Sequence, residues 1–138
     1  GRVSGPLLDR FDLRVRVERP VVDDLLSGER GESSAVVARR VATARSRAIA
    51  RQGVMNAGLS AGDLDTMAPL DPSALTVLRD QMERGRLSGR GYHRIRRVAR
   101  TIADLAPEPM IVIDEPTVTL ALDMRTDVRP VGAPRAAA

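Results

Sequence analysis

The run from residue 87 to residue 105 limits the possible folds of this chain more than any other feature. Within it, small or apolar side chains recur in steps of four, three, four and three residues, at Gly91, Ile95, Val98, Ile102 and Leu105. This spacing places them on one face of an α-helix. Ser88 stands where an N-cap residue belongs, and Pro107 cannot continue a helix. The sequence therefore predicts a long amphipathic helix over residues 88–106.

The other faces of this helix carry basic side chains. At about 100° per residue, Arg94 lies roughly 70° from the centre of the apolar face, at the edge of the core. Its stem is expected to be half-covered, with the guanidinium group able to reach a neighbouring anion. Arg96, Arg97 and Arg100 lie roughly 130° or more from that centre, so we expect them to point into solvent.

Composition favours a bundle of helices. Aromatic residues make up only 1% of the chain and hydrophobic residues 43%, so the core must be aliphatic and rich in alanine. Helical spacing, N-cap residues and prolines predict further helices over residues 33–52, 60–67, 72–84 and 114–125, and residues 21–26 are compatible with a short one. In the helix over residues 33–52, the expected core face consists of Val37, Val41, Ala44, Ala48 and Ile49. The predicted fold is mainly α, with four to five helices.

Residues 11–17 alternate between apolar and charged side chains, a period of two that predicts one half-buried strand. A single strand cannot satisfy its own backbone groups, and only residues 110–113 offer a second extended segment. The strand is expected to pair there, between molecules, or with a sheet that lies upstream, which we favour. On this interpretation residues 1–20 end a domain that lies upstream and are partly disordered alone, residues 21–126 form the helical domain, and residues 127–138 form a disordered tail.

Several classes of function are excluded by composition. All 22 basic residues are arginine, so the chain lacks the lysine of a phosphate-binding P-loop, and we expect no ATP hydrolysis by this chain alone. It has no cysteine, and its single histidine, His93, has no acidic residue at ligand spacing, so no metal site is expected. No apolar run approaches the ~18 residues of a membrane span, which favours a cytoplasmic protein without a membrane partner.

Four stretches resemble the magnesium chelatase-like AAA+ ATPases, in the branch associated with competence and DNA processing. They are SGPLLDRFDLRVRV (residues 4–17), NAGLS (residues 56–60), LDPSALTVLRDQMERGRLS (residues 70–88) and LSGRGYHRIRRVARTIADL (residues 87–105). The first is similar to the end of that family's ATPase core, and the other three are similar to its C-terminal lid. The resemblance, over residues 4–125, implies an AAA+ lid-type bundle preceded by one strand of the core.

The same resemblance implies roles for three arginines. Arg10, in the L-D-R-F-D motif, matches the arginine finger that reaches the ATP site of a neighbouring subunit. Arg94 matches the sensor-2 arginine, which contacts the terminal phosphates of a nucleotide, and Arg97, one turn further on, is the alternative. The parent protein would bind ATP and Mg²⁺ and act as a hexameric motor on DNA. Its core and neighbouring subunits would be the partners of this chain, which alone would bind neither ATP nor Mg²⁺.

Two other functions remain open at this point. Residues 70–84, the turn at Gly85 and the arginine-rich helix after Ser88 could form a helix-turn-helix, with Arg90, Arg94 and Arg97 against duplex DNA. Against this, the basic residues surround the helix instead of selecting one face, and no aromatic residues are interleaved for stacking on single strands. A bundle that serves only protein interaction is the third alternative.

Overall fold

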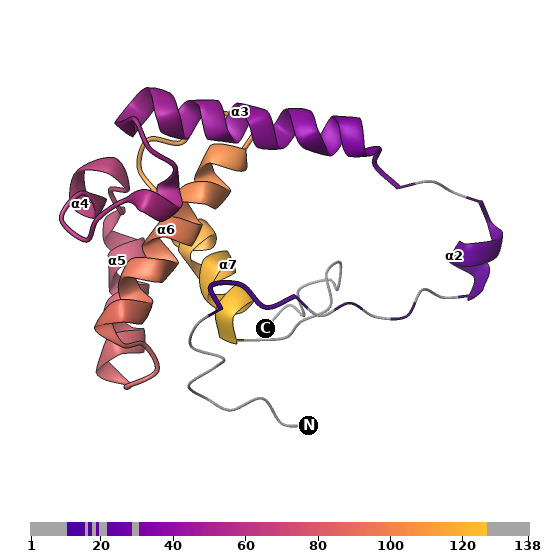
Figure 1. The fold of residues 1–138 in the computed structure, drawn as a ribbon. Coiled ribbons are helices and arrows are strands. Elements are labelled where there is room, and N and C mark those ends of the chain that lie inside the picture. The colour runs from indigo at the N-terminus through magenta and orange to yellow at the C-terminus, as the bar shows by residue number, and fades with distance from the viewer. Residues whose placement is uncertain (1–10, 16, 18, 20–21, 29–30, 127–138) are drawn as a thin grey trace.

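The computed structural model describes residues 11–15, 17, 19, 22–28 and 31–126, and it confirms the predicted helical bundle (Figure 1). Its elements are α2 (Val22–Leu26), α3 (Ser34–Gln52), the 3-10 turn η1 (Asn56–Gly58), α4 (Leu64–Met67), α5 (Pro72–Glu83), α6 (Gly89–Leu105) and α7 (Glu115–Thr126). The predicted tail over residues 127–138 and the first ten residues lie outside the described part of the chain.

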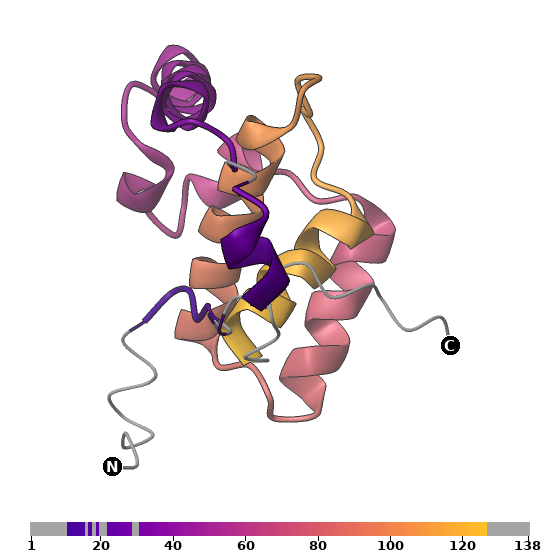
Figure 2. The ribbon, with the colours of Figure 1, turned by 90° about the vertical axis from the view of Figure 1, so that its right-hand side faces the viewer.

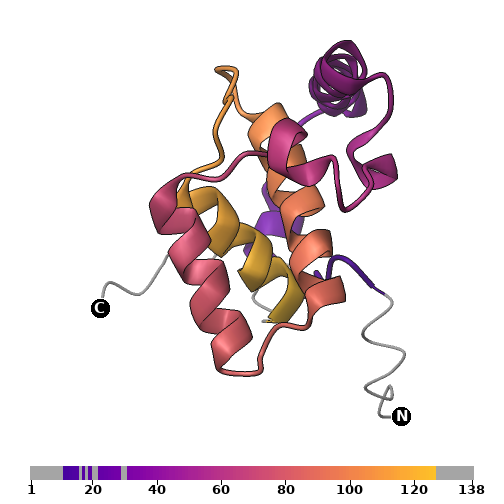
Figure 3. The same ribbon diagram turned by 90° about the vertical axis from the view of Figure 1, so that its left-hand side faces the viewer.

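Helix α6 is the centre of the bundle. It contacts α3, α4, α5, α7 and η1, and it runs beside α5 and α7 in Figure 3. The core around it is aliphatic and rich in alanine, as composition predicts. It consists of Leu59, Leu64, Ala68, Ala74, Leu78, Leu87, Ile95, Ala99, Ala103, Ile113, Val118, Ala121 and Leu122.

The ends of the main helices are set by local residues, as the sequence predicts. The Ser88 hydroxyl accepts a hydrogen bond from the backbone N–H of Gly91 at 3.1 Å and begins α6. The Asp71 carboxylate accepts from the N–H of Ala74 at 2.6 Å and begins α5, with a proline at its first position. Gly53 ends α3 in the left-handed conformation, at φ 74°. These helices therefore begin and end within one or two residues of their predicted bounds.

Helix α4 is shorter than predicted. Ser60 and Asp63 bind each other reciprocally, since the Ser60 N–H donates to Asp63 Oδ2 at 3.2 Å and the Asp63 N–H donates to Ser60 Oγ at 3.3 Å. These bonds close a turn over residues 61–63, and the helix itself covers only Leu64–Met67. The helix thus begins four residues after Ser60, and the residue at its N-cap position is Asp63, whose side chain makes no capping hydrogen bond.

The extended segment that ends at Ile113 pairs with the entrance of α5. The N–H of Ile113 donates to the carbonyl of Pro69 at 2.8 Å, and the N–H of Asp71 donates to the carbonyl of Ile113 at 2.9 Å. An isolated parallel bridge joins Leu70 to Ile113. The described residues 11–15 and 17 form no bridge to this segment, so the first of the three pairings expected for them is not seen.

The predicted strand over residues 11–17 does not form among the described residues of that segment. Phe11, Leu13 and Val15 are 51%, 48% and 59% exposed, so the alternating side chains cover no face. Without a second strand beside them, these backbone groups have no ladder to join. The segment bends at Asp12, and its backbone reaches α7 through the N–H of Arg14, which donates to the carbonyl of Met124 at 2.8 Å.

The predicted core face of α3 is correct only at its C-terminal end. Ala44 and Ala48 are buried, whereas Val37, Val41 and Ile49 are 37%, 36% and 47% exposed. Figures 1 and 2 show the reason, since α3 crosses one end of α6 and its first half extends beyond the bundle. A helical apolar stripe predicts which side chains share a face, but not how far that face is covered.

One substitution in the buried core and one in the exposed half of α3 test this difference in burial. Replacing the fully buried Leu78 of α5 in Leu78→Ala should lower the free energy of unfolding by about 2–5 kcal/mol, because it removes packed methyl groups and leaves a cavity. Val41→Ala should lower it by less than about 1 kcal/mol, since Val41 is partly exposed and alanine favours helix. Urea denaturation followed by circular dichroism measures both, and equal losses would contradict the exposure of α3.

Candidate functional site

Arg94 lies in the first half of α6, at the edge of the bundle. Its side chain is 25% exposed, and its Nε lies 3.4 Å from Oδ1 of Asp12, which is 58% exposed. This agrees with the half-covered stem and reachable guanidinium that helical geometry predicts. Arg10, the other arginine expected to act at a nucleotide, lies outside the described residues.

Arg97, the alternative to Arg94, is turned toward its own bundle. Its Nε donates a hydrogen bond of 2.9 Å to the carbonyl of Leu59, in the loop between η1 and α4, and its side chain is half-buried. The expectation that Arg97 points into solvent is therefore wrong. Arg97 holds the η1–α4 loop against α6, whereas Arg94 pairs with the exposed Asp12.

Arg96 is also buried, contrary to the prediction, with 3% of its surface exposed. Its guanidinium donates to the carbonyls of Leu64 and Ala68 at 2.7 and 2.9 Å and pairs with Asp65 at 2.5 Å. Ala68 lies just past the end of α4, where helix carbonyls lack partners within the helix, while the Leu64 carbonyl also accepts the N–H of Ala68. Arg96 thus caps α4 from α6, and this cation explains how a helix of one turn is held in place.

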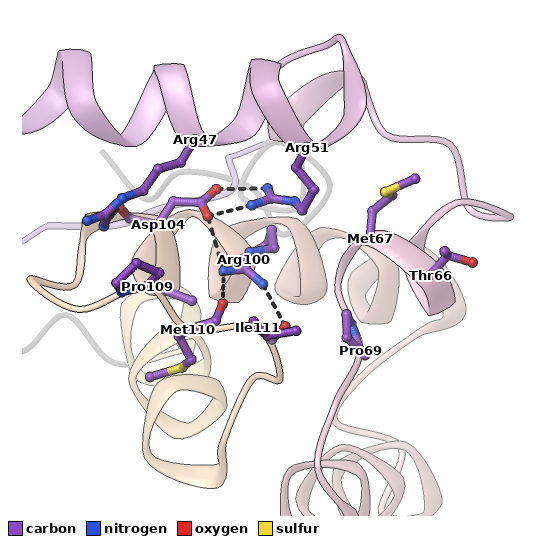
Figure 4. Close-up of a pocket in the computed structure, with 11 residues that line it drawn as sticks. Arg47, Arg51, Thr66, Met67, Pro69, Arg100, Asp104, Pro109, Met110 and Ile111 are labelled. Atoms are coloured by element: carbon purple, nitrogen blue, oxygen red, sulfur yellow. Dashed lines mark hydrogen bonds and ion pairs between the residues drawn. The ribbon is translucent and has the colours of Figure 1, made fainter.

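Arg100 is 2% exposed and lies one turn beyond Arg96. Its guanidinium donates to the carbonyls of Met110 and Ile111, and it pairs with Asp104 at 3.1 Å (Figure 4). It therefore fixes the loop between α6 and α7. The prediction failed for both arginines because a guanidinium can be buried when its N–H groups meet carbonyl and carboxylate oxygens, which periodicity does not reveal.

Asp104 connects α6 to α3 and η1. It is 2% exposed, and Arg51 donates to its two oxygens at 2.7 and 2.9 Å, while Asn56 donates at 2.8 Å. With the contact from Arg100, four donors surround this carboxylate. Burial alone would raise the pKa of Asp104, but the hydrogen bonds from Arg51 and Asn56 and the charge of Arg100 hold that pKa below its ordinary value.

This network was missed at the sequence level. The available signal was the spacing of Arg96, Arg100 and Asp104, which recur every four residues beside Ala99 and Ala103. Small side chains on a helix let a neighbouring element approach closely, so long polar side chains next to them are covered. Helix α6 is buried on this second stripe as well as on the face that contains Ile95.

A cavity of about 250 Å³ lies beside the network (Figure 4). Its walls include Arg47, Arg51, Thr66, Met67, Pro69, Arg100, Ala103, Asp104, Pro109, Met110 and Ile111. Arg47 donates to the carbonyls of Asp104, Ala106 and Pro107, so it caps the end of α6. Since all three arginines in the wall already donate to protein oxygens, an anion entering the cavity would have to displace those contacts.

Two features are absent from the described residues. No group of three or more His, Asp or Glu side chains is placed there to hold a metal ion. None of the helices in that part of the chain has the length and apolar character needed to cross a membrane.

The pKa of Asp104 predicts how stability depends on pH. Its lowered folded-state pKa stabilises the fold at pH values above the ordinary value of 3.8, and this contribution is lost as the pH falls through the folded-state pKa. Asp104→Asn should lower the free energy of unfolding at pH 7 by about 3 kcal/mol, because Arg51 and Arg100 lose their counter-charge. In urea denaturation, the difference from wild type should shrink below pH 4, whereas the exposed control Glu108→Gln should differ little from wild type. If the difference in the free energy of unfolding between Asp104→Asn and wild type stayed constant with pH, the lowered pKa of Asp104 would be contradicted.

Comparison with known proteins places this chain in a family. Residues 31–125 match the family described as magnesium chelatase, subunit ChlI C-terminal. Competence protein ComM of Haemophilus influenzae is 39% identical over 129 residues, which cover 93% of this chain and 25% of ComM. The uncharacterized protein Rv2897c of Mycobacterium tuberculosis is 42% identical over 129 residues, covering 91% of this chain and 25% of that protein. The uncharacterized protein YifB of Escherichia coli is 38% identical over 111 residues, covering 80% and 22%. The chain thus spans about a quarter of the length of these relatives.

Proposed function

Because this chain belongs to the magnesium chelatase ChlI C-terminal family, in a group with competence-associated relatives, we propose that it serves as the lid of a longer AAA+ ATPase. In this role the bundle lies over the nucleotide held by the ATPase core and contributes side chains to its hydrolysis. The chain's share of its relatives, about a quarter, is consistent with one domain of a larger protein.

Arg94 is the residue that we propose contacts the terminal phosphates of the nucleotide. The observation that carries this assignment is its position at the rim of α6, 25% exposed, while Arg96 and Arg100 are buried. Arg97 fits the role less well because its Nε is bound to the carbonyl of Leu59. A guanidinium at the edge of a rigid helix can donate to phosphate oxygens without a change in the bundle.

The residues of this chain would supply only part of a binding site for ATP and Mg²⁺. Arg94 is a suitable donor to a phosphate oxygen, but the chain has no lysine for a P-loop, and its described residues offer no carboxylate cluster for Mg²⁺. The core of the intact protein would therefore hold both. When bound, they would supply the phosphoryl group and the metal that neutralises its charge.

Arg10 is proposed as an arginine finger that acts at the ATP site of a neighbouring subunit, in a hexamer. The support is its place in the L-D-R-F-D motif, immediately before the segment that contacts the lid. A DNA-processing role for the intact protein is supported by the competence branch of the family, to which ComM belongs by its name. The partners of this chain would be the ATPase core, the adjacent subunits and, through the motor, DNA.

The alternative of a helix-turn-helix domain is less well supported. A recognition helix must enter the major groove, but α6 is surrounded by α3, α4, α5, α7 and η1. Of the arginines that would face DNA, Arg97 is bound within the bundle and Arg94 lies beside Asp12. These contacts favour the lid function.

Activity of the intact protein tests the assignment of Arg94. That protein would be recognised by a G-x-x-x-x-G-K-[ST] motif upstream of this chain in the same reading frame. In it, Arg94→Ala should lower kcat for ATP hydrolysis by about 100-fold, because a donor to the transferring phosphoryl group is lost. The matched control is Arg90→Ala, an exposed arginine one turn earlier on α6, which should retain wild-type activity. Equal effects of the two substitutions would argue against a special role for Arg94.

Binding to DNA separates the lid from the helix-turn-helix domain. Fluorescence anisotropy of a labelled duplex titrated with this chain should give a dissociation constant no tighter than about 1 µM at physiological salt, the range of non-specific binding. A tighter complex with a steep dependence on salt would favour the DNA-binding alternative. Measurements at several salt concentrations distinguish the two outcomes.

A further inference from the structure

The segment that precedes the lid touches the bundle through polar contacts. Within residues 11–15, Asp12 lies beside Arg94 of α6, and the N–H of Arg14 donates to the carbonyl of Met124 in α7. The apolar side chains of the same segment, Phe11, Leu13 and Val15, are about half exposed. The position of this segment on the bundle therefore depends on hydrogen bonding and charge instead of apolar burial.

The two contacts differ in how easily another group can replace one of the partners. A backbone hydrogen bond of 2.8 Å joins Arg14 to Met124. The pair between Asp12 and Arg94 is longer, at 3.4 Å, and both side chains reach solvent. Exposed pairs of this kind are weak because water screens the charges. By contrast, Asp104 is enclosed by two arginines and an asparagine and cannot be released without leaving charges buried.

We propose that Asp12 is a positioning residue for Arg94: its carboxylate holds the Arg94 guanidinium until a terminal phosphate of the nucleotide takes its place. This inference rests on the proposed function, in which Arg94 contacts that phosphate. Carboxylate and phosphate oxygens are both acceptors for a guanidinium, and the phosphate carries more negative charge. The exchange therefore needs no rearrangement of α6.

The exchange has a mechanical consequence. When Arg94 turns to a phosphate, the segment around Asp12 loses this ion pair with α6 and keeps the hydrogen bond to α7 between Arg14 and Met124. Because Arg10 lies two residues before Asp12, the release occurs next to the proposed arginine finger. Occupancy of one nucleotide site would thus loosen the segment that serves the next subunit.

Steady-state kinetics of the intact ATPase test the proposal. Asp12→Asn keeps the shape of the side chain but removes its charge, so this carboxylate no longer competes with the phosphate for Arg94. The KM for ATP should fall about two- to fivefold, the range expected for loss of an exposed ion pair, with kcat nearly unchanged. Asp12→Glu should restore a KM close to that of wild type. The control Glu108→Gln removes an exposed carboxylate far along the chain and should leave both constants unchanged.

A double-substitution cycle separates this inference from the proposed function. If Arg94→Ala impairs hydrolysis but Asp12→Asn leaves KM unchanged, the positioning role is wrong and the lid function stands. If Arg94→Ala has no effect, the proposed function of Arg94 fails, and the inference fails with it. The inference further requires that Asp12→Asn change nothing when Arg94 is already alanine.

A spectroscopic measurement on this chain tests the contact directly. In ¹⁵N NMR spectra, the Nε–H signal of Arg94 should shift in Asp12→Asn and not in Glu108→Gln. Addition of inorganic tripolyphosphate should shift the Arg94 signal at lower concentration in Asp12→Asn than in wild type, because the competing carboxylate is absent. Identical titrations of the two proteins would overturn the proposed competition, and a merely structural role of Asp12 predicts that result.

Discussion

The arrangement of the bundle depends on the buried carboxylate of Asp104. It accepts hydrogen bonds or charge from Arg51 of α3 and Arg100 of α6 (Figure 4). It also accepts a hydrogen bond from Asn56 of η1, so a single acceptor joins three elements. A buried charge is tolerated only when it is paired and hydrogen-bonded, and the loss of one partner leaves the others uncompensated. The crossing of α3 over the end of α6 is therefore set by charge as well as by the packing of Ala44 and Ala48.

Helix α6 uses the same residue type for two purposes. Arg96 and Arg100 are buried. Arg96 donates to carbonyls at α4 and caps that helix, and Arg100 donates to a carbonyl of the loop before α7 and fixes that loop against α6. Arg94 lies at the rim beside Asp12 and keeps part of its surface in water. The buried pair gives α6 a fixed position, and that rigidity is what allows an arginine on its edge to present a guanidinium at a defined place. This division links the stability of the bundle to the function that we propose.

Local features of this fold were predicted from the sequence, whereas contacts between distant residues were not. The caps at Ser88 and Asp71 were predicted because a side chain and a backbone N–H three residues away satisfy each other locally. The accessible position of Arg94 followed from helical angles alone. The burial of Arg96 and Arg100 did not, because their acceptors are carbonyls of residues 64, 68, 110 and 111, which only the folded chain brings to α6.

The sequence by itself determined the existence of the helices, the ends of all the long ones, the aliphatic character of the core and the family. Each of these depends on spacing or on neighbours within a few residues. Only the tertiary structure decided which faces are covered. Val37 and Val41 share a stripe with Ala44, yet they are exposed because α3 extends past the end of α6. The physical reason is that burial depends on where other elements end, and hydrogen bonds between distant residues set those positions.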